Sequence, residues 1–173
     1  MSSILLSRLD VDHLYQPFLL AVAEMLEDLQ KQGLEFWGVS GYRSEKEQMK
    51  LWAQGRTQPG PIVTRAKALE SAHNFGLAVD LCRDMNMERA GLQPSWKPQD
   101  YAVLDKACRL HGLEWGGWWG FRDYPHVQLA GYVTADELRP LAATWRRTQG
   151  SDLVRLGAVW DAIDEAHEVL TPN

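Results

Sequence analysis

The feature that most constrains this chain is the run SAHNFGLAVDLC at residues 71–82. Gly76 stands between His73 and Asp80, and glycine can take the left-handed backbone conformation that a sharp turn requires. The alternation after the glycine predicts a strand in which Asp80 and Cys82 share one face. The turn therefore allows a histidine and an aspartate, with six residues between them, to converge near the start of a strand.

A second histidine lies in a comparable setting within the run RDYPHVQL. His126 follows Asp123 by three residues, and Pro125 between them discourages a helix, so we expect a loop that enters a strand. Catalytic zinc sites use three ligands such as His, Asp or Glu and leave a fourth position for water. Each of the two histidines thus lies near a carboxylate, as a metal ligand could, but salt-bridged or hydrogen-bonded surface groups would show the same spacing.

The other histidines and the two cysteines lack such a setting. His13 and His167 lie in predicted terminal or helical segments, and His111 ends a predicted helix, where an imidazole can interact with exposed carbonyl groups. We expect structural or surface roles for all three. Cys82 and Cys108 do not form a CxxC pair, which excludes a cysteine zinc site. Free buried thiols and a disulfide are both compatible with the sequence.

Hydrophobic periodicity and capping signals predict both helices and short strands. The segments that begin at Ser44 and Thr134 match the capping box S/T-x-x-E, at which a helix starts. The predicted helices are residues 15–32, 44–55, 98–111 and 151–170, besides the one that starts at Thr134; the predicted strands are 35–39, 62–64, the run after Gly76 and 126–129. We expect an α+β fold in which helices pack on a small antiparallel sheet, with a zinc site at the sheet edge.

Several sequence blocks resemble the family of D-alanyl-D-alanine carboxypeptidases and VanY-like peptidases. SAHNFGLAVDL matches the family pattern S-x-H-x-x-G-x-A-x-D, RDYPHVQL resembles its closing D/E-x-x-H block, and SGYRSEKEQ resembles its G-Y-R-S-x-x-x-Q segment. The stretch LWAQGRTQPGPIVTRAKALE, which leads into the first block, is especially similar to the L-alanyl-D-glutamate peptidase branch, which contains many phage endolysins. The blocks occur in the right order over roughly residues 15–132, so chance is a poor explanation.

The resemblance implies a role for each matching residue. It makes the following assignments: zinc ligands His73, Asp80 and His126, with one zinc ion per chain, and catalytic residues Asp123 and Arg43. Zinc with two neutral imidazoles and one carboxylate keeps a positive charge, which activates water and polarises a carbonyl. A carboxylate beside it can move a proton to the leaving amine, and a guanidinium can face the oxyanion or a substrate carboxylate. The alternative is a surface ion pair for Arg43 and a loop cap for Asp123.

Two further residues match positions at the rim of the family's substrate site. Ser71 matches a serine at the edge of that site, with a hydrogen bond to the local backbone as the alternative. Trp119 aligns with the tryptophan of the branch's GGDW segment and is predicted to bind substrate, with core or lid packing as the alternative. Trp118 stands where that segment has an acid, so this chain departs from the branch at that place.

The function that the resemblance implies is that of a zinc-dependent, endolysin-like peptidoglycan endopeptidase, which hydrolyses the L-Ala–D-Glu bond of the stem peptide. A D-Ala–D-Ala carboxypeptidase or dipeptidase is the first alternative, and a non-catalytic metal-binding phage structural module is the second. All three predicted ligands and the predicted catalytic carboxylate are present, which favours an active enzyme. The expected partner is bacterial peptidoglycan.

The resemblance ends near residue 132, so we expect residues 1–132 to form the catalytic core and residues 133–173 a helical extension packed on the same domain. A net charge of −5 without a visible basic patch argues against a nucleic-acid partner. The N-terminus lacks a signal-peptide pattern and no run of about 18 apolar residues occurs, so membrane insertion is not expected. We expect the protein in the cytoplasm of the producing cell, reaching the wall after permeabilisation by a partner such as a holin.

Overall fold

The computed structural model describes residues 4–85 and 91–170. The chain divides into two compact units, each of which combines two separate stretches. The first unit contains the described residues of 1–41 and 77–130, and the second contains those of 42–76 and 131–173. The predicted division into a catalytic core and an extension after residue 132 stays a prediction. The grouping of 42–76 with the C-terminal stretch was not predicted.

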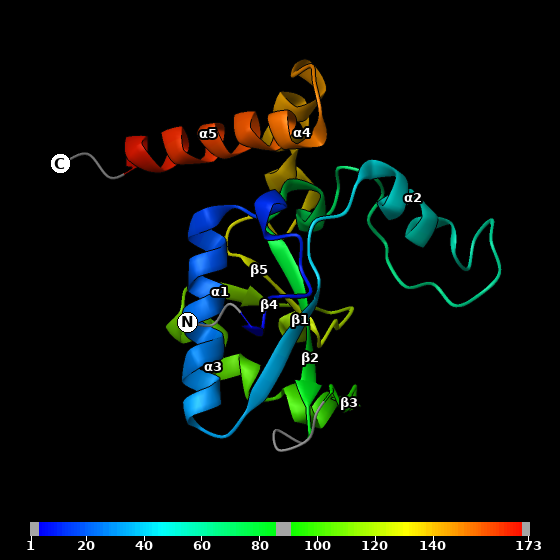
Figure 1. Cartoon of the computed structure of the whole chain (residues 1–173). Helices are drawn as coiled ribbons and strands as arrows, with labels where there is room; N and C mark the ends of the chain where they lie inside the picture. Colours follow the sequence, from blue (N-terminus) through cyan, green and yellow to red (C-terminus); the bar gives the residue numbers. More distant parts are fainter. Residues whose placement is uncertain (1–3, 86–90, 171–173) are drawn as a thin grey trace. The chain divides into compact units, whose positions relative to one another are not determined.

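The first unit is built around an antiparallel sheet (Figure 1). Its strands are β1 (Glu35–Ser40), β2 (Ala78–Asp84), β3 (Pro94–Ser95), β4 (Leu113–Trp115) and β5 (His126–Leu129). The main path runs β1-β2-β5-β4, and β3 pairs with β2. Every one of these pairings is antiparallel, which confirms the predicted α+β class with a small antiparallel sheet. β2 and β5 are the inner strands of this path, so a neighbouring strand fixes each of them on either side.

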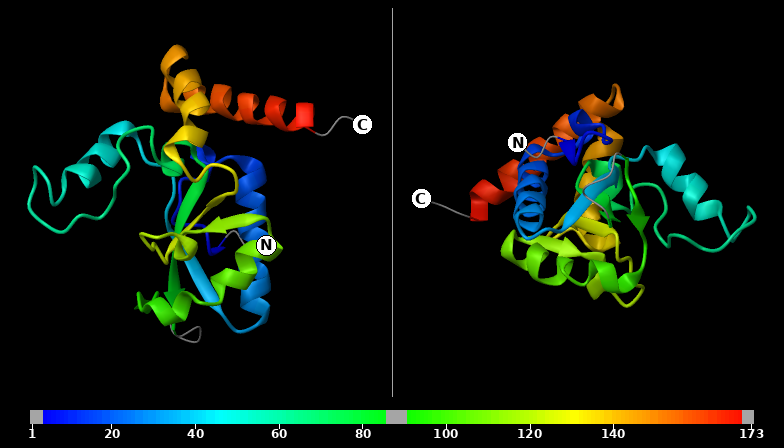
Figure 2. Two further views of the ribbon diagram at one scale, coloured as in Figure 1. Left: turned by 180° about the vertical axis from the view of Figure 1, so that it is seen from behind. Right: turned by 60° about the horizontal axis from the view of Figure 1, so that its bottom comes forward.

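Two helices of the first unit lie against each other beside the sheet (Figure 2). They are α1 (Gln16–Lys31) and α3 (Leu104–Leu110). One face of α1 is apolar and buried, and it consists of Phe18, Val22, Met25, Leu26 and Leu29. Burial of one such side chain contributes about 1.5–3 kcal/mol, so this face holds α1 on the unit's core. At the contact with α3 the sulfur atoms of Met25 and Cys108 lie 3.7 Å apart, and both cysteines are buried free thiols.

Three parts of the predicted secondary structure are wrong or incomplete. The helix predicted over 98–111 is interrupted, because Pro98–Tyr101 forms a short 3-10 turn, η4, before α3 begins. Residues 62–64 form no strand: no described strand pairs with them, and the two apolar side chains in this segment are exposed. β3 and β4 were not predicted, because their two and three residues are too few to show a periodic pattern.

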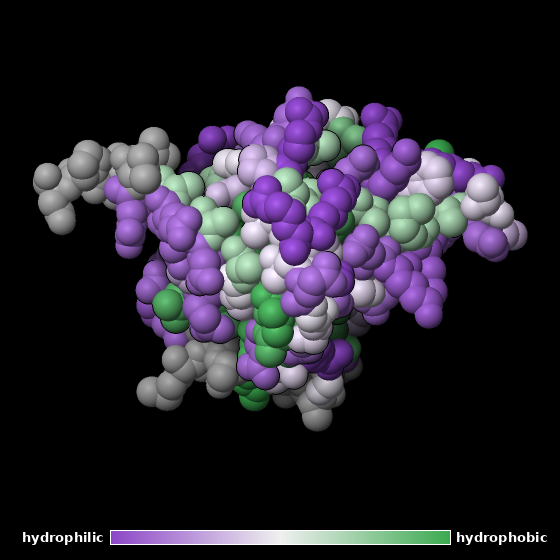
Figure 3. All heavy atoms as spheres, turned by 90° about the horizontal axis from the view of Figure 1, so that it is seen from above, coloured by the Kyte–Doolittle hydropathy of each residue, from purple (hydrophilic) through white to green (hydrophobic). Residues whose placement is uncertain are grey.

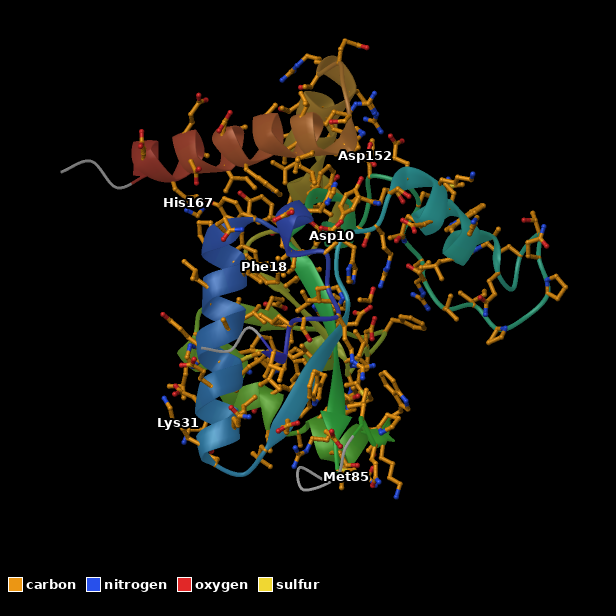
Figure 4. All side chains as sticks on the ribbon, in the orientation of Figure 1. Asp10, Phe18, Lys31, Met85, Asp152 and His167 are labelled. Atoms are coloured by element: carbon orange, nitrogen blue, oxygen red, sulfur yellow. The ribbon has the colours of Figure 1, made fainter. Side chains whose placement is uncertain are left out.

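The second unit contains α2 (Glu45–Ala53), the 3-10 turn η3 (Ala72–Phe75), α4 (Ala135–Arg147) and α5 (Asp152–Leu170). Both predicted capping boxes are present, at the N-termini of α2 and α4. Trp145 of α4 donates its indole N–H to Glu45 at 2.9 Å, and the Tyr42 hydroxyl donates to Asp152, labelled at the start of α5 in Figure 4, at 2.6 Å. These bonds connect the C-terminal helices to the segment that carries the SGYRSEKEQ block.

Among the described residues, no helix combines the length and the apolar character needed to cross a bilayer. Figure 3 shows hydrophilic side chains over most of the face that it displays, with hydrophobic ones in small separate groups. Large apolar side chains are gathered instead in the interior of each unit, where Phe36, Tyr101 and Leu104 of the first unit and Trp145 of the second are almost fully buried.

Candidate metal centre

β2 and β5 bring together two of the three predicted metal ligands. Asp80 and His126 are directly opposite each other in the antiparallel pairing, so their side chains project from the same face of the sheet. His126 Nδ1 lies 3.3 Å from Asp80 Oδ1, and the two side chains are 7% and 19% exposed. The metal site was predicted at the edge of the sheet. Since β2 and β5 are inner strands, the two residues lie at the end of the sheet where β5 begins and not on an outer strand.

The third predicted ligand comes from the turn that precedes β2. His73 belongs to η3 and is 1% exposed. Gly76 ends this turn with a φ of 68°, and its N–H points back to carbonyl groups of Ala72 and His73. A residue with a side chain would be strained at this φ, so glycine is what allows the chain to leave η3 and enter the strand. The turn predicted from the sequence is therefore present.

The three residues offer a set of donors that fits a divalent cation. One potential ligand atom from each of His73, Asp80 and His126 lies within 4.8 Å of those from the other two. In a tetrahedral zinc site with bonds of about 2.0–2.1 Å, neighbouring ligand atoms lie roughly 3.3 Å apart. The Asp80–His126 separation of 3.3 Å agrees with that spacing. Two imidazoles and one carboxylate match the ligand types of a catalytic zinc site with an open position.

Charged neighbours make this position favourable for a cation. Burial lowers the pKa of His126, but the hydrogen bond to Asp80, the negative charge of Asp80 and that of Asp123 outweigh burial and raise this pKa above its ordinary value. The carboxylates that stabilise an imidazolium also stabilise a metal cation in the same place. The negative charges of Asp80 and Asp123 thus offset the positive charge of a bound metal ion, which neutral imidazole ligands leave unchanged.

Asp123, the predicted catalytic carboxylate, lies in the loop that leads into β5. The Asp123 N–H donates to the Gly116 carbonyl oxygen at 3.1 Å, and the His126 N–H donates to the Asp123 carbonyl oxygen at 3.2 Å. A Cβ atom at Gly116 would overlap with the Asp123 carbonyl oxygen, so only glycine lets the loop approach η5 (Gly116–Trp118) this closely. The loop thereby fixes a half-buried carboxylate whose charge acts on a predicted ligand.

Arg43 is connected to the turn that carries His73. Its N–H donates to the His73 carbonyl oxygen at 3.1 Å, and its own carbonyl oxygen accepts the side-chain amide of Asn74 at 2.7 Å. The half-buried Arg43 side chain donates from Nη1 to Gln48 Oε1 at 3.4 Å. Ser71, also half-buried, is the residue that precedes η3, and its side chain makes no capping bond there. The second unit therefore gathers Arg43, Ser71 and His73 at one turn.

Trp119 lies against the ring of a predicted ligand. The ring centroids of Trp119 and His126 are 4.9 Å apart with a tilt of 49° between the planes. The Trp119 indole N–H donates to Glu114 on β4 at 3.1 Å, which holds the indole in this position. Trp119 thus supports the His126 ring, and the predicted contact of Trp119 with substrate stays a prediction.

Trp118, the residue at which we expect this chain to depart from the family branch, is directed to α3. Its indole N–H donates to Asp105 Oδ1 at 2.6 Å, and the Arg109 guanidinium lies 4.1 Å from the ring centroid. A guanidinium over an indole face contributes a cation–π attraction in addition to packing. Trp118 therefore gives this chain a packing contact between η5 and α3.

The remaining histidines have other partners or surroundings. His13 Nδ1 lies 2.8 Å from Asp10 Oδ2, and His111 Nε2, at the C-cap of α3, lies 3.3 Å from Asp28 Oδ2. His167 is exposed on α5, as labelled in Figure 4. These placements agree with the structural or surface roles expected for the three histidines.

Sequence reasoning gave no role to Gln128, which contacts the predicted site. It lies two residues after His126, is 2% exposed, and its Oε1 is 2.8 Å from His126 Nε2. The signal that points to it is the two-residue period of a strand, which places Gln128 on the same face as the predicted ligand.

Two comparisons with known proteins bear on this site. Residues 64–129 match the sequence family described as D-alanyl-D-alanine carboxypeptidase. The chain is 39% identical over 106 residues to the peptidoglycan L-alanyl-D-glutamate endopeptidase CwlK of Bacillus subtilis (strain 168). That similarity covers 57% of this chain and 62% of CwlK, which is less than two thirds of the relative's length. The matches confirm the resemblance to the VanY-like peptidase family and to its L-alanyl-D-glutamate branch.

Proposed function

We propose that this relative of the L-alanyl-D-glutamate peptidases is a metal-dependent endopeptidase that hydrolyses the L-Ala–D-Glu bond in the stem peptide of bacterial peptidoglycan. The observation that carries the proposal is the cluster of His73, Asp80 and His126, whose potential ligand atoms lie within 4.8 Å of one another. CwlK is a peptidoglycan L-alanyl-D-glutamate endopeptidase, which supports this bond and this substrate.

The metal that we propose is zinc, one ion per chain, with His73, Asp80 and His126 as its ligands. A divalent metal held there supplies Lewis acidity, which activates a water molecule and polarises the scissile carbonyl. The donor set also fits other divalent ions, because affinity order alone does not select among them. Elemental analysis of the purified protein measures both the identity and the stoichiometry of the metal.

Asp123 and Arg43 are the residues that we assign to the chemistry. Asp123 takes a proton from the attacking water and passes it to the leaving amine, as the new C–O bond forms and the C–N bond breaks. Its fixed loop and its charge beside His126 support this role. Arg43 remains charged and presents a planar set of donors to the oxyanion or to a substrate carboxylate. Ser71 and Trp119 are proposed to line the substrate site.

A D-Ala–D-Ala carboxypeptidase is the second candidate, because the family matched by residues 64–129 carries that description. Digestion of purified peptidoglycan by the metal-loaded protein, followed by mass spectrometry of the fragments, tests both activities. Stem peptides that begin at D-Glu support the endopeptidase, whereas release of D-Ala alone favours the carboxypeptidase. Bound metal without any cleavage favours a non-catalytic metal-binding module. Protein stripped with a chelator is the control.

The biological setting that we propose is that of a phage endolysin, supported by the similarity to a branch that contains many such enzymes. In this setting the protein accumulates in the cytoplasm of the producing cell and reaches the wall once a holin-like partner has permeabilised the membrane. Expression in a susceptible bacterium, with and without a permeabilising agent, tests this. Lysis only with the agent agrees with the proposal, and rapid lysis without it contradicts the need for a partner.

A further inference from the structure

Gln128 is a buried polar residue for which the proposed mechanism has no role. It is 2% exposed and lies on β5, two residues after His126. Alternate residues of a strand project to the same side, so the two side chains share a face of the sheet. His126 Nε2 and Gln128 Oε1 lie 2.8 Å apart, which is the length of a good hydrogen bond.

The register of the sheet gives Gln128 room to make this contact. Ala78 on β2 is directly opposite Gln128, in the same way that Asp80 is directly opposite His126. The side chain of Ala78 is a single methyl group, so the longer Gln128 side chain can extend along the strand toward the imidazole. Asp80 then lies at Nδ1 and Gln128 at Nε2 of one ring.

The chemistry of the two groups decides where the imidazole carries its hydrogen. An amide carbonyl oxygen can only accept, so in this contact Nε2 is the donor. A carboxylate oxygen also only accepts, so Nδ1 can bond Asp80 only in the imidazolium, in which both ring nitrogens carry a hydrogen. The neutral imidazole that binds a metal has one N–H, and with that hydrogen on Nε2 the lone pair of Nδ1 lies on the side of Asp80. Metal-ligating histidines usually donate their other N–H to an oxygen atom, which fixes both the tautomer and the orientation of the ring.

We propose that Gln128 is a positioning residue of the metal centre, which orients the His126 ring and selects Nδ1 as the ligand atom. This inference rests on the proposed metal site. Trp119 contacts the same ring in a tilted arrangement, at a centroid distance of 4.9 Å, but this ring contact does not choose between the two nitrogens. Removal of the acceptor at position 128 is expected to weaken metal binding about 10–100-fold, the usual effect of losing such a partner.

The test compares three variants of the full chain in a competition between protein and a chromogenic chelator for zinc. Gln128→Met removes the acceptor with little change in volume and is expected to bind about 10–100-fold more weakly. Gln128→Glu keeps an acceptor and is expected to bind at least as tightly as the unmodified protein. Gln93→Met, the same exchange at a half-buried glutamine whose N–H bonds Asp84, is the control and is expected to keep its affinity. The absorption bands of the cobalt-substituted protein should change in Gln128→Met and persist in Gln128→Glu.

A second measurement needs no variant. Long-range 1H–15N correlation spectra of the zinc-loaded protein report which ring nitrogen of His126 carries a hydrogen, and we expect Nε2. A hydrogen on Nδ1, or wild-type affinity in Gln128→Met while His126→Ala loses the metal, overturns the role of Gln128 alone. Full zinc binding by His126→Ala overturns the ligand assignment as well, so the two failures are distinguishable.

Discussion

Asp80 and His126 face each other across two neighbouring inner strands, with His126 Nδ1 3.3 Å from Asp80 Oδ1. Backbone pairing between β2 and β5 sets this relationship, so it does not depend on the side chains alone. His73 precedes β2 by only one short turn, which ends at Gly76. Substitution of a single ligand should consequently remove the metal while the sheet remains folded.

The first prediction concerns the metal ligands. His126→Ala removes one of three donors, and the remaining two should not retain zinc through dialysis. Elemental analysis should find about one zinc ion per chain in the unmodified protein and almost none in the variant, since a catalytic site needs three protein ligands. His111→Ala, at a histidine that pairs with Asp28, is the matched control and should keep its zinc. Stoichiometric zinc in His126→Ala would show that the assignment is wrong.

The second prediction separates metal binding from proton transfer. Asp123→Asn keeps the size of the side chain but cannot take a proton from water at neutral pH. We expect the variant to retain its metal and to lose about 10²–10⁴-fold in the rate of peptide hydrolysis, the usual contribution of a general acid–base group. Elemental analysis and turnover are measured on the same preparation. Near-normal turnover would remove Asp123 from the mechanism.

Local patterns in the sequence were sufficient for the parts of the fold that depend on neighbouring residues. The helix over α1, both capping boxes and the turn at Gly76 each arise from interactions within a few positions of the chain, so the sequence displays them directly. The proposed ligands could be grouped because the motif places His73 and Asp80 on either side of that turn. Assigning His126 to the same cluster required the family resemblance, because its pairing with β2 is long-range.

Features that depend on long-range packing could not be predicted. β4 forms because its backbone pairs with that of β5, and a run of three residues does not reveal such a partner. The bond from Trp160 to the Phe75 carbonyl oxygen joins positions 85 residues apart. It helps to place the segment 42–76 and the C-terminal helices in one unit, a grouping that the sequence did not predict. Sequence periodicity reports which face of an element is apolar but not which other element covers it.

The third prediction concerns this contact between α5 and η3. The Trp160 indole N–H donates to the Phe75 carbonyl oxygen at 2.9 Å. Trp160→Phe keeps an aromatic ring but leaves that carbonyl without this donor, and we expect the free energy of unfolding to fall by about 1–3 kcal/mol. Denaturant titration followed by circular dichroism measures it. Trp96→Phe, at an exposed tryptophan of the first unit, should change stability by less than about 0.5 kcal/mol.

The fourth prediction concerns the thiols and pH. Burial raises the pKa of Cys82 to about 11 and that of Cys108 to about 12. Unfolded cysteines ionise near pH 8.5, so the unfolded chain loses these protons first as the pH rises. The free energy of unfolding should therefore be unaffected by the thiols below about pH 8 and should fall progressively above that value. Iodoacetamide at pH 8 should modify both cysteines in guanidinium and neither in the native protein. Rapid labelling of the native protein would contradict the burial.

The last prediction concerns the bond. A defined muropeptide with a stem that ends in D-Ala–D-Ala offers both candidate bonds in one molecule. Asp123 and Arg43 could serve the hydrolysis of either amide, so the choice must come from the walls of the substrate site. A carboxypeptidase has to capture a free terminal carboxylate, whereas an endopeptidase needs a groove that admits chain on both sides of the scissile bond. The similarity to CwlK favours the second arrangement, with Arg43 facing the oxyanion or the D-Glu carboxylate.

Mass spectrometry should therefore detect free peptide that begins at D-Glu, with L-Ala left on the sugar, and Asp123→Asn should yield little of it. Release of D-Ala with the L-Ala–D-Glu bond intact would instead establish the carboxypeptidase, because the same metal-loaded protein would have chosen the terminal amide when both were available.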